Sequence, residues 1–314
     1  METLEGNKKF TKPITVCVLA LISCFLWGSA FPCVKIGYEL FEISASDTAS
    51  VLLFAGLRFS LAGILVITFG SIIERRVLLP KKSSLWKIFL LCLAQTVVQY
   101  AFFYVGLSRT TGVKASIIEA MNVFVAIVVA AFIFRQEKFT FLKAVGCMLG
   151  MAGIVVVNLN GLSFEASLTG EGFIFISTVS YAFSACMLKL FSKSEDTFVL
   201  SGYQFFFGGI ILSVVGLAFG GKLAAFSFAA GAMLLYLALI SSVAYTLWGV
   251  LLKYNSPSRV AVFGFMNPVF GVILSALLLK ETIDPLLCVF ALLLTSAGIV
   301  LINVWGEKDF FGKK

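Results

Sequence analysis

The chain alternates between long apolar stretches and short polar segments along almost its whole length. A helix needs about 20 residues, at about 1.5 Å rise per residue, to cross roughly 30 Å of hydrocarbon. Ten stretches are long enough, and their approximate bounds are 13–36, 48–73, 84–107, 112–134, 139–159, 169–190, 198–220, 229–252, 258–280 and 285–305. The pattern therefore predicts an all-α membrane protein with ten transmembrane helices and no inserted soluble domain.

Part of this pattern occurs twice. The segment Tyr100–Asn122 (YAFFYVGLSRTTGVKASIIEAMN) aligns without a gap with Tyr245–Asn267 (YTLWGVLLKYNSPSRVAVFGFMN), 145 positions later. Arg58–Ile64 matches a segment 146 positions later, and AGIVVVN, which ends at Asn158, recurs as AGIVLIN 145 positions later. Matches that keep their order and nearly one offset predict a duplication, and residues that align between the copies are repeat mates.

The duplication predicts two inverted halves, residues 1–160 and 161–314, with five crossings each. Because five is an odd number, the second half must cross the membrane in the opposite direction to the first. Inverted repeats of this kind are typical of alternating-access transporters, in which two halves rock about a site near the midplane of the bilayer.

Composition and charge favour a membrane location. A chain with 60% hydrophobic and 13% charged residues is too apolar for a soluble domain, so its expected partner is the lipid bilayer. If the N-terminus is cytoplasmic, the cytoplasmic side receives 18 Lys and Arg residues and the outer side five. The positive-inside rule thus predicts cytoplasmic N- and C-termini in the plasma or inner membrane. The net charge of +8 is scattered over loop ends, which argues against a nucleic-acid partner.

The first apolar stretch also has the outline of a signal peptide, because KKFTK precedes ITVCVLALISCFLWGSA. Two features favour a retained first helix. The apolar run continues through Phe31–Val34, and the spacing from Trp27 to Lys35 recurs in the second half from Tyr181 to Lys189. Cleavage would remove part of a repeat unit.

The residues needed for common catalytic chemistry are missing from the sequence. The chain has no histidine, its seven cysteines form no CxxC pair, and it contains neither HExxH nor GxSxG. This composition disfavours a zinc centre, a Ser-His-Asp triad and an intramembrane enzyme. We therefore predict no catalytic residue, no metal and no cofactor.

Several motifs together resemble the EamA branch of the drug/metabolite transporter superfamily. They are WGSAF in the first helix, the Arg58–Phe59 pair in the second, the Asn and the acidic junction of the fourth and ninth helices, and the closing AGIVVVN and AGIVLIN. The resemblance covers nearly the whole chain. It implies a ten-helix permease with a central cavity that exports amino acids or other small metabolites, and it specifies no single substrate.

Arg58 and Glu119 are the charged residues that lie well inside apolar spans. A charge at the bilayer centre costs roughly 2.5–3.5 kcal/mol on insertion scales, so it normally faces a partner or a wet cavity. Their depths from the outer side are roughly 15 and 11 Å at 1.5 Å per residue. They could form a structural ion pair. Alternatively, Arg58 binds a substrate carboxylate or phosphate while Glu119 binds a cationic group or a coupling proton.

Five side-chain amides within the spans are further cavity candidates: Gln95, Gln99, Asn122, Gln204 and Asn267. Gln204 is the repeat mate of Arg58, so the two halves differ in charge at this position. Asn122 lies one helical step from Glu119 and is the repeat mate of Asn267. A buried amide needs a partner, and interhelical hydrogen bonding explains the two asparagines as well as substrate contact does.

Aromatic residues recur at matched positions, which are Trp27 with Tyr181, Tyr100 with Tyr245, and Phe103 with Trp248. Most of the 33 phenylalanines fill space or face lipid. The Trp and Tyr members are better cavity candidates, because their polar edges require partners. They favour an aromatic or amphipathic substrate.

Pro32 and Pro268 interrupt the first and ninth helices, where each removes a backbone hydrogen bond. They are candidate hinges or gates, although packing also tolerates such residues. Gly146 and Gly150 form a GxxxG pattern that favours close helix contact, either within the bundle or between protomers.

Together these features predict a permease that moves a small organic solute, with export favoured by the resemblance alone. An open channel, a lipid scramblase and a receptor-like membrane protein are the alternatives. The pattern predicts no oligomeric state.

Overall fold

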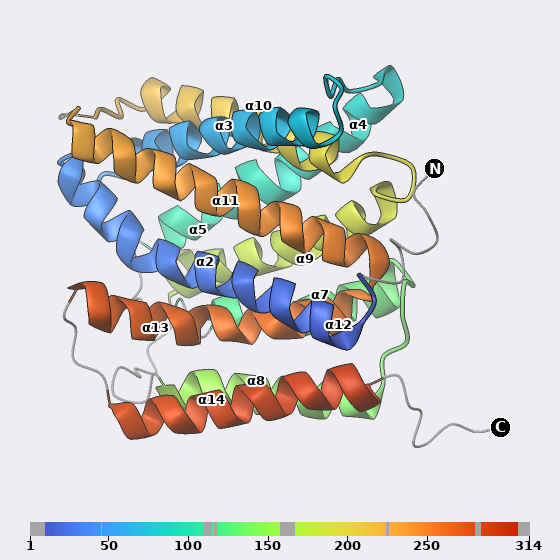
Figure 1. Ribbon diagram of the computed structural model, residues 1–314. Helices are drawn as coiled ribbons and strands as arrows, with labels where there is room; N and C mark the ends of the chain where they lie inside the picture. The colour runs from blue at the N-terminus through green and yellow to red at the C-terminus, as the bar shows by residue number, and fades with distance from the viewer. Residues whose placement is uncertain are drawn as a thin grey trace.

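The computed structural model describes residues 10–44, 46–107, 109, 115, 118–157, 167–223, 226–279 and 284–306. Helices form most of this part of the chain, and Figure 1 shows them running side by side in one bundle. In chain order their bounds are α2 (Pro13–Leu40), α3 (Thr48–Ile73), α4 (Lys82–Leu91), η1 (Cys92–Val98), α5 (Gln99–Leu107), α7 (Asn122–Val128), η2 (Val129–Ile133), α8 (Phe141–Val157), η4 (Leu168–Gly172), α9 (Phe173–Phe191), α10 (Thr197–Ala218), α11 (Phe228–Tyr254), α12 (Pro257–Ala261), η5 (Val262–Phe265), α13 (Met266–Leu279), α14 (Pro285–Val300) and η6 (Leu301–Trp305).

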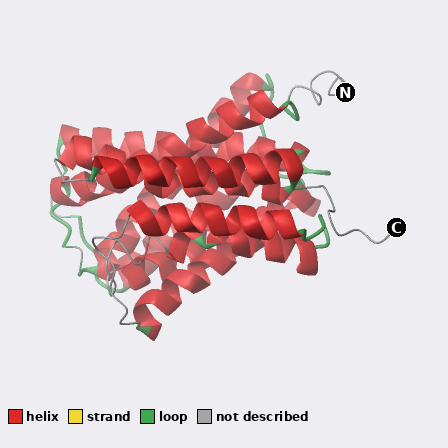
Figure 2. Ribbon diagram, turned by 90° about the horizontal axis from the view of Figure 1, so that it is seen from below, coloured by secondary structure: helices red, strands yellow, loops and turns green. Residues whose placement is uncertain are grey.

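Eight continuous helical segments within the described residues are long and apolar enough to cross a membrane. Two shorter apolar segments, Ile118–Ile133 and Phe141–Val156, complete the set. Some crossings join several elements, as α4, η1 and α5 do between Lys82 and Leu107. The predicted ten-helix all-α membrane fold is confirmed, and Figure 2 shows helices and loops throughout the described chain.

The helices are arranged in layers between two antiparallel pairs. Figure 1 places α3 and α10 along one side of the bundle and α8 and α14 along the other, with α2, α5, α7, α9, α11 and α13 between them. The start of α2 and the end of η6 lie at the same end of the bundle. We call this the terminal end, and it is the end that the charge pattern predicts to be cytoplasmic.

Each flanking pair consists of two repeat-mate helices that run in opposite directions. A Cβ atom on Gly63 would lie 2.6 Å from the carbonyl oxygen of Gly202, and one on Gly209 would lie 2.6 Å from that of Gly56. Residue numbers therefore rise along α3 as they fall along α10. Only glycine permits this approach of two backbones. The halves are thus inverted, while the predicted boundary at residue 160 lies outside the described residues.

The pair α8 and α14 crosses in the same way. A Cβ on Gly146 would lie 3.1 Å from the carbonyl oxygen of Gly298, and one on Gly150 would collide with the ring of Phe265. The GxxxG pattern therefore serves contacts within the bundle.

Polarity is distributed as expected for a protein in lipid. Large apolar side chains such as Phe132, Met148 and Leu277 remain exposed on the outside, where acyl chains would contact them. Polar side chains are buried instead, including Arg58 and Gln204. The chemistry of the molecule therefore lies inside the bundle.

Candidate functional site

Arg58 lies near the centre of the α3–α10 crossing and is only 6% exposed. Its Nε donates hydrogen bonds to the Ser241 hydroxyl at 3.1 Å and to the Leu237 carbonyl at 3.3 Å, both on α11. The side chain of Tyr104 is a further electrostatic neighbour. The guanidinium carbon also lies 5.3 Å from the centroid of the Phe59 ring. Because both hydrogen bonds to α11 use Nε and the guanidinium has five N–H donors, donors beyond the one that the Tyr104 hydroxyl can engage remain for an anionic group.

Gln204 has equivalent surroundings in the other half. The Thr96 hydroxyl donates to its Oε1 at 2.7 Å, and its Nε2 donates to the Gln95 Oε1 at 3.2 Å. Thr96 is the repeat mate of Ser241, so the contact between Arg58 and Ser241 recurs as the contact between Gln204 and Thr96. The surroundings of the two sites are related by the repeat, but their charges differ.

Four aromatic rings occupy the internal symmetry axis between these polar sites. The hydroxyls of Tyr100 and Tyr245, which are repeat mates, lie 2.6 Å apart. Phe59 stacks on its own mate Phe205, with ring centroids 5.5 Å apart and an interplanar angle of 20°. The contact of Phe59 with Tyr100 (4.3 Å) is repeated by that of Phe205 with Tyr245 (4.8 Å). We call these four residues the central aromatic cluster.

Trp27 and Trp248 extend the cluster on one side. The ring of Trp27 packs edge-on against Tyr245 and Trp248, with both centroid distances at 4.9 Å. Its Nε1 is buried and has no hydrogen-bond partner among the described residues. Tyr181, the repeat mate of Trp27, is buried and interacts with Trp248. The aromatic residues predicted from the repeat are therefore brought together.

Glu119 is half-buried. It interacts electrostatically with Tyr104, Tyr181 and Tyr245. Arg58 also interacts with Tyr104 and Tyr245. No ion pair joins Arg58 to Glu119 in the described part of the chain. The two charges therefore flank one group of tyrosines without the structural ion pair that the sequence also allowed.

The other side-chain amides predicted to line the cavity differ in their hydrogen bonds. Gln95 is part of the polar contact around Gln204, whereas the buried Oε1 of Gln99 has no partner among the described residues. Asn122 begins α7 and Asn267 lies in α13. Neither asparagine makes an interhelical hydrogen bond within the described chain, and the Oδ1 of Asn267 is buried without a partner. For these asparagines, interhelical hydrogen bonding and substrate contact both stay predictions.

The two prolines have different local effects. Pro32 is buried within α2, which continues to Leu40. Pro268 has no N–H to donate to the carbonyl of Gly264, and the preceding segment Val262–Phe265 is a 3₁₀-helix. The irregular turn thus accompanies Pro268 alone, and a hinge role for either proline stays a prediction.

Sequence reasoning missed the polar partners Ser241, Leu237 and Thr96 and the rings Phe59 and Phe205. Serine and threonine are common in membrane helices, so these residue types did not point to a site. The repeat could have done so, because Ser241 and Thr96 are repeat mates, as are Phe59 and Phe205.

Comparison with known proteins agrees with this architecture. The chain is 28% identical to a WAT1-related chloroplastic protein of Arabidopsis thaliana, over 89% of this chain and 67% of that protein. It is 26% identical to the uncharacterized inner membrane transporter YedA of Escherichia coli K12, over 87% and 88%. It is 28% identical to a probable amino-acid metabolite efflux pump of the same organism, over 93% and 95%.

A solved crystal structure shares the fold, with a TM-score of 0.76, 14% sequence identity, and coverage of 92% of this chain and 96% of the other. The model of the EamA-like transporter family matches residues 14–159 and 168–304, one match in each half. This protein therefore belongs to the EamA-like transporter family.

Proposed function

We propose that this membrane transporter exports a small organic metabolite with an anionic group, such as an amino acid or a related compound, by alternating access. The observation that carries the proposal is Arg58, which is buried near the crossing centre of the two halves and is held there through its Nε, with N–H groups on its terminal nitrogens beyond those that its neighbours use. A buried guanidinium with remaining N–H groups matches a carboxylate in charge and geometry.

The surrounding residues suit the rest of such a substrate. Tyr245, an electrostatic neighbour of Arg58, packs with Trp27, which in turn packs with Trp248, and this aromatic surface with polar edges suits an aromatic or amphipathic body. Glu119 is the candidate partner for a cationic group or a coupling proton. The relative named as a probable amino-acid metabolite efflux pump supports both the substrate class and the export direction.

We further propose that the protein resides in the plasma or inner membrane with its terminal end in the cytoplasm. The excess of lysine and arginine on that side supports this orientation. A relative described as an inner membrane transporter supports the location.

The test begins with a thermal-shift screen of the detergent-purified protein against amino acids, nucleosides, sugar phosphates and cationic drugs. A ligand that binds the folded state raises the melting temperature by mass action. We expect carboxylate-bearing compounds to stabilise the protein, and Arg58→Gln to lose the shift. Lys82→Gln, which removes an exposed cation from α4, is the control.

The stabilising compound is then tested for counterflow in proteoliposomes, where one labelled molecule exchanges for another. Saturable counterflow supports a transporter. Flux without saturation would instead indicate a channel, and exchange of labelled lipid without solute transport would indicate a scramblase. Stabilisation by uncharged or cationic compounds only would contradict the role of Arg58.

A further inference from the structure

A polar cavity of about 300 Å³ lies at the terminal end of the second half. It shares no lining residue with the central aromatic cluster. Its lining comes from the end of α11, the start of α12 and η6, and consists of Tyr254, Asn255, Ser256, Ser258, Arg259, Ile302 and Asn303.

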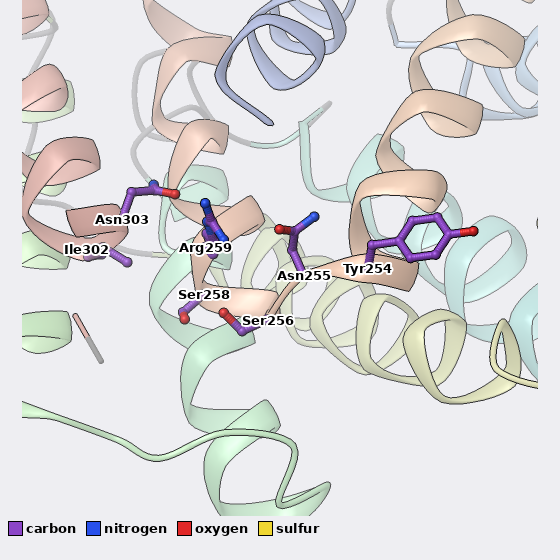
Figure 3. A pocket seen from close by; sticks show the side chains of 7 residues that line it. All are labelled: Tyr254, Asn255, Ser256, Ser258, Arg259, Ile302 and Asn303. Carbon is purple, nitrogen blue, oxygen red and sulfur yellow. The ribbon is translucent and has the colours of Figure 1, made fainter. Parts of the chain in front are cut away.

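Arg259 provides positive charge in this cavity. Figure 3 shows it between Asn303 on one side and Asn255 on the other. Its Nη2 donates to the Thr11 carbonyl at 3.2 Å, which holds the guanidinium in place. Its Nε is buried without a hydrogen-bond partner, and no carboxylate of the described residues pairs with it. The guanidinium of Arg259 is therefore fixed in position, and its Nε–H is an unused hydrogen-bond donor.

Two amide oxygens add acceptors beside this cation. Asn255 is 4% exposed, and its Nδ2 donates to the carbonyls of Leu251 and Phe10 at 2.9 and 3.0 Å. These bonds fix the amide, and its Oδ1 is left buried without a partner in the described chain. The Nδ2 of Asn303 donates to the Ile299 carbonyl at 3.1 Å, so its Oδ1 is also an acceptor.

The nearby acidic residue does not compete for Arg259. Glu137 accepts a hydrogen bond from the Ser258 hydroxyl at 2.6 Å and lies 3.3 Å from the ammonium of Lys143, with both charged side chains almost fully buried. Its charge is therefore balanced by Lys143. On the other side of Asn255, the ammonium of Lys189 donates to the Asn255 backbone carbonyl. The surroundings of the cavity are positive.

We propose that this cavity binds a phosphate ester whose alcohol part has free hydroxyl groups, as in glycerol phosphate. Arg259 would bind the phosphate through a charge-assisted hydrogen bond. The Oδ1 atoms of Asn255 and Asn303 would accept hydrogen bonds from the hydroxyls. Basic pockets between helices on the cytoplasmic side of a membrane are suited to anionic lipid headgroups. A phosphatidylglycerol headgroup and soluble glycerol phosphate share this chemistry.

The experiment measures the melting temperature of the purified full chain with each source. One arm uses mixed micelles that contain phosphatidylglycerol, against phosphatidylcholine at the same mole fraction. The other arm uses glycerol 3-phosphate in pure detergent. We expect one of these probes to stabilise the wild type. Because a hydrogen bond to a charged group is lost, we expect Arg259→Gln to weaken apparent binding by at least about tenfold.

Lys82→Gln is the matched control, because it removes an exposed cation from α4 without touching the cavity, and it should keep the full shift. Asn303→Ala provides a second cavity variant if Arg259→Gln does not fold, and we expect it to weaken binding as well. A shift with phosphatidylglycerol alone supports a lipid site, and one with glycerol 3-phosphate supports a soluble ligand. If neither probe stabilises the wild type, or if both cavity variants bind like the control, the proposal is wrong.

Discussion

At the residue scale, the repeat revealed the site better than residue types did. Arg58 could be predicted as a site residue, because a charged side chain inside an apolar span normally faces a partner or a wet cavity. Its partners Ser241 and Leu237 could not, because they are more than 175 positions away along the chain and only the fold brings them close. Once Ser241 and Thr96 are recognised as mates, Gln204 emerges as the neutral counterpart of Arg58.

This equivalence predicts that the positive charge of Arg58 can be transferred to position 204 in the other half. Arg58→Gln should lower the initial rate of counterflow of an anionic substrate by at least about tenfold, because a charge-assisted hydrogen bond is lost. Adding Gln204→Arg should restore part of that rate, since Thr96 and Gln95 supply acceptors for the new guanidinium. A double variant that folds, as judged by its melting temperature, yet transports no better than Arg58→Gln would refute the equivalence.

Glu119 gives a second prediction at this scale. If it carries the coupling proton, Glu119→Gln should remove the pH dependence of transport, because a glutamine side chain does not titrate in the range of the assay. The measurement is the uptake rate in proteoliposomes between about pH 5.5 and pH 8, a range in which the proton concentration changes more than a hundredfold. Glu42→Gln, at an exposed position after α2, is the control. Unchanged pH dependence would exclude Glu119 as the proton carrier.

At the element scale, the hydrophobic pattern predicted the crossings well but not their internal geometry. The bounds of α3, α10 and α11 agree with the predicted spans to within two residues. The π-helical turns at Cys92–Val98 and Val129–Ile133 could not be predicted. Such turns depend on tertiary packing, and η1 presents Gln95 and Thr96 to Gln204. A local widening of the helix thus helps to form the second polar site.

The close crossing of α3 and α10 predicts a strong cost for added volume. Gly63→Ala should lower stability by about 1–3 kcal/mol, because the new Cβ would overlap the backbone of α10. Gly231→Ala, in α11, meets no atom within 4 Å and should instead add about 0.5–1 kcal/mol through its helix propensity. Thermal unfolding in one detergent compares the two. Equal stability of both variants would argue against the observed crossing.

A polar link between α4 and the segment before α10 predicts pH-dependent stability. Hydrogen bonds from Lys87 and Ser84 lower the pKa of Glu195 below its usual value of 4.5. The resulting stability is therefore present above the unfolded pKa and is lost as the pH falls through the folded pKa. Glu195→Gln should cost up to about 1 kcal/mol at pH 7, and the difference from wild type should vanish at lower pH. A difference that persists in acid would contradict this assignment.

At the scale of the whole molecule, the odd number of crossings per half predicted the inversion, and the antiparallel mates α3 and α10 show it. The sequence did not predict how the halves are fastened at the terminal end. There, three side chains of the described junction after η2 form hydrogen bonds with the second half. Gln136 Nε2 donates to the Cys186 carbonyl at 2.8 Å, Ser258 Oγ to Glu137 at 2.6 Å, and Thr140 Oγ1 to the Gly306 carbonyl at 2.7 Å.

These contacts must separate if the halves rock apart at this end, as alternating access requires. We therefore expect a bridge between positions 137 and 258 to stop transport. The variant carries Glu137→Cys and Ser258→Cys in a background whose seven cysteines are replaced by alanine. A short bifunctional methanethiosulfonate reagent should abolish counterflow, and a reductant should restore it. Each single-cysteine variant, treated in the same way, controls for modification without bridging. The bridge fixes only the terminal end. If the bridged protein exchanges substrate as fast as the protein after treatment with the reductant, this end does not open during the cycle.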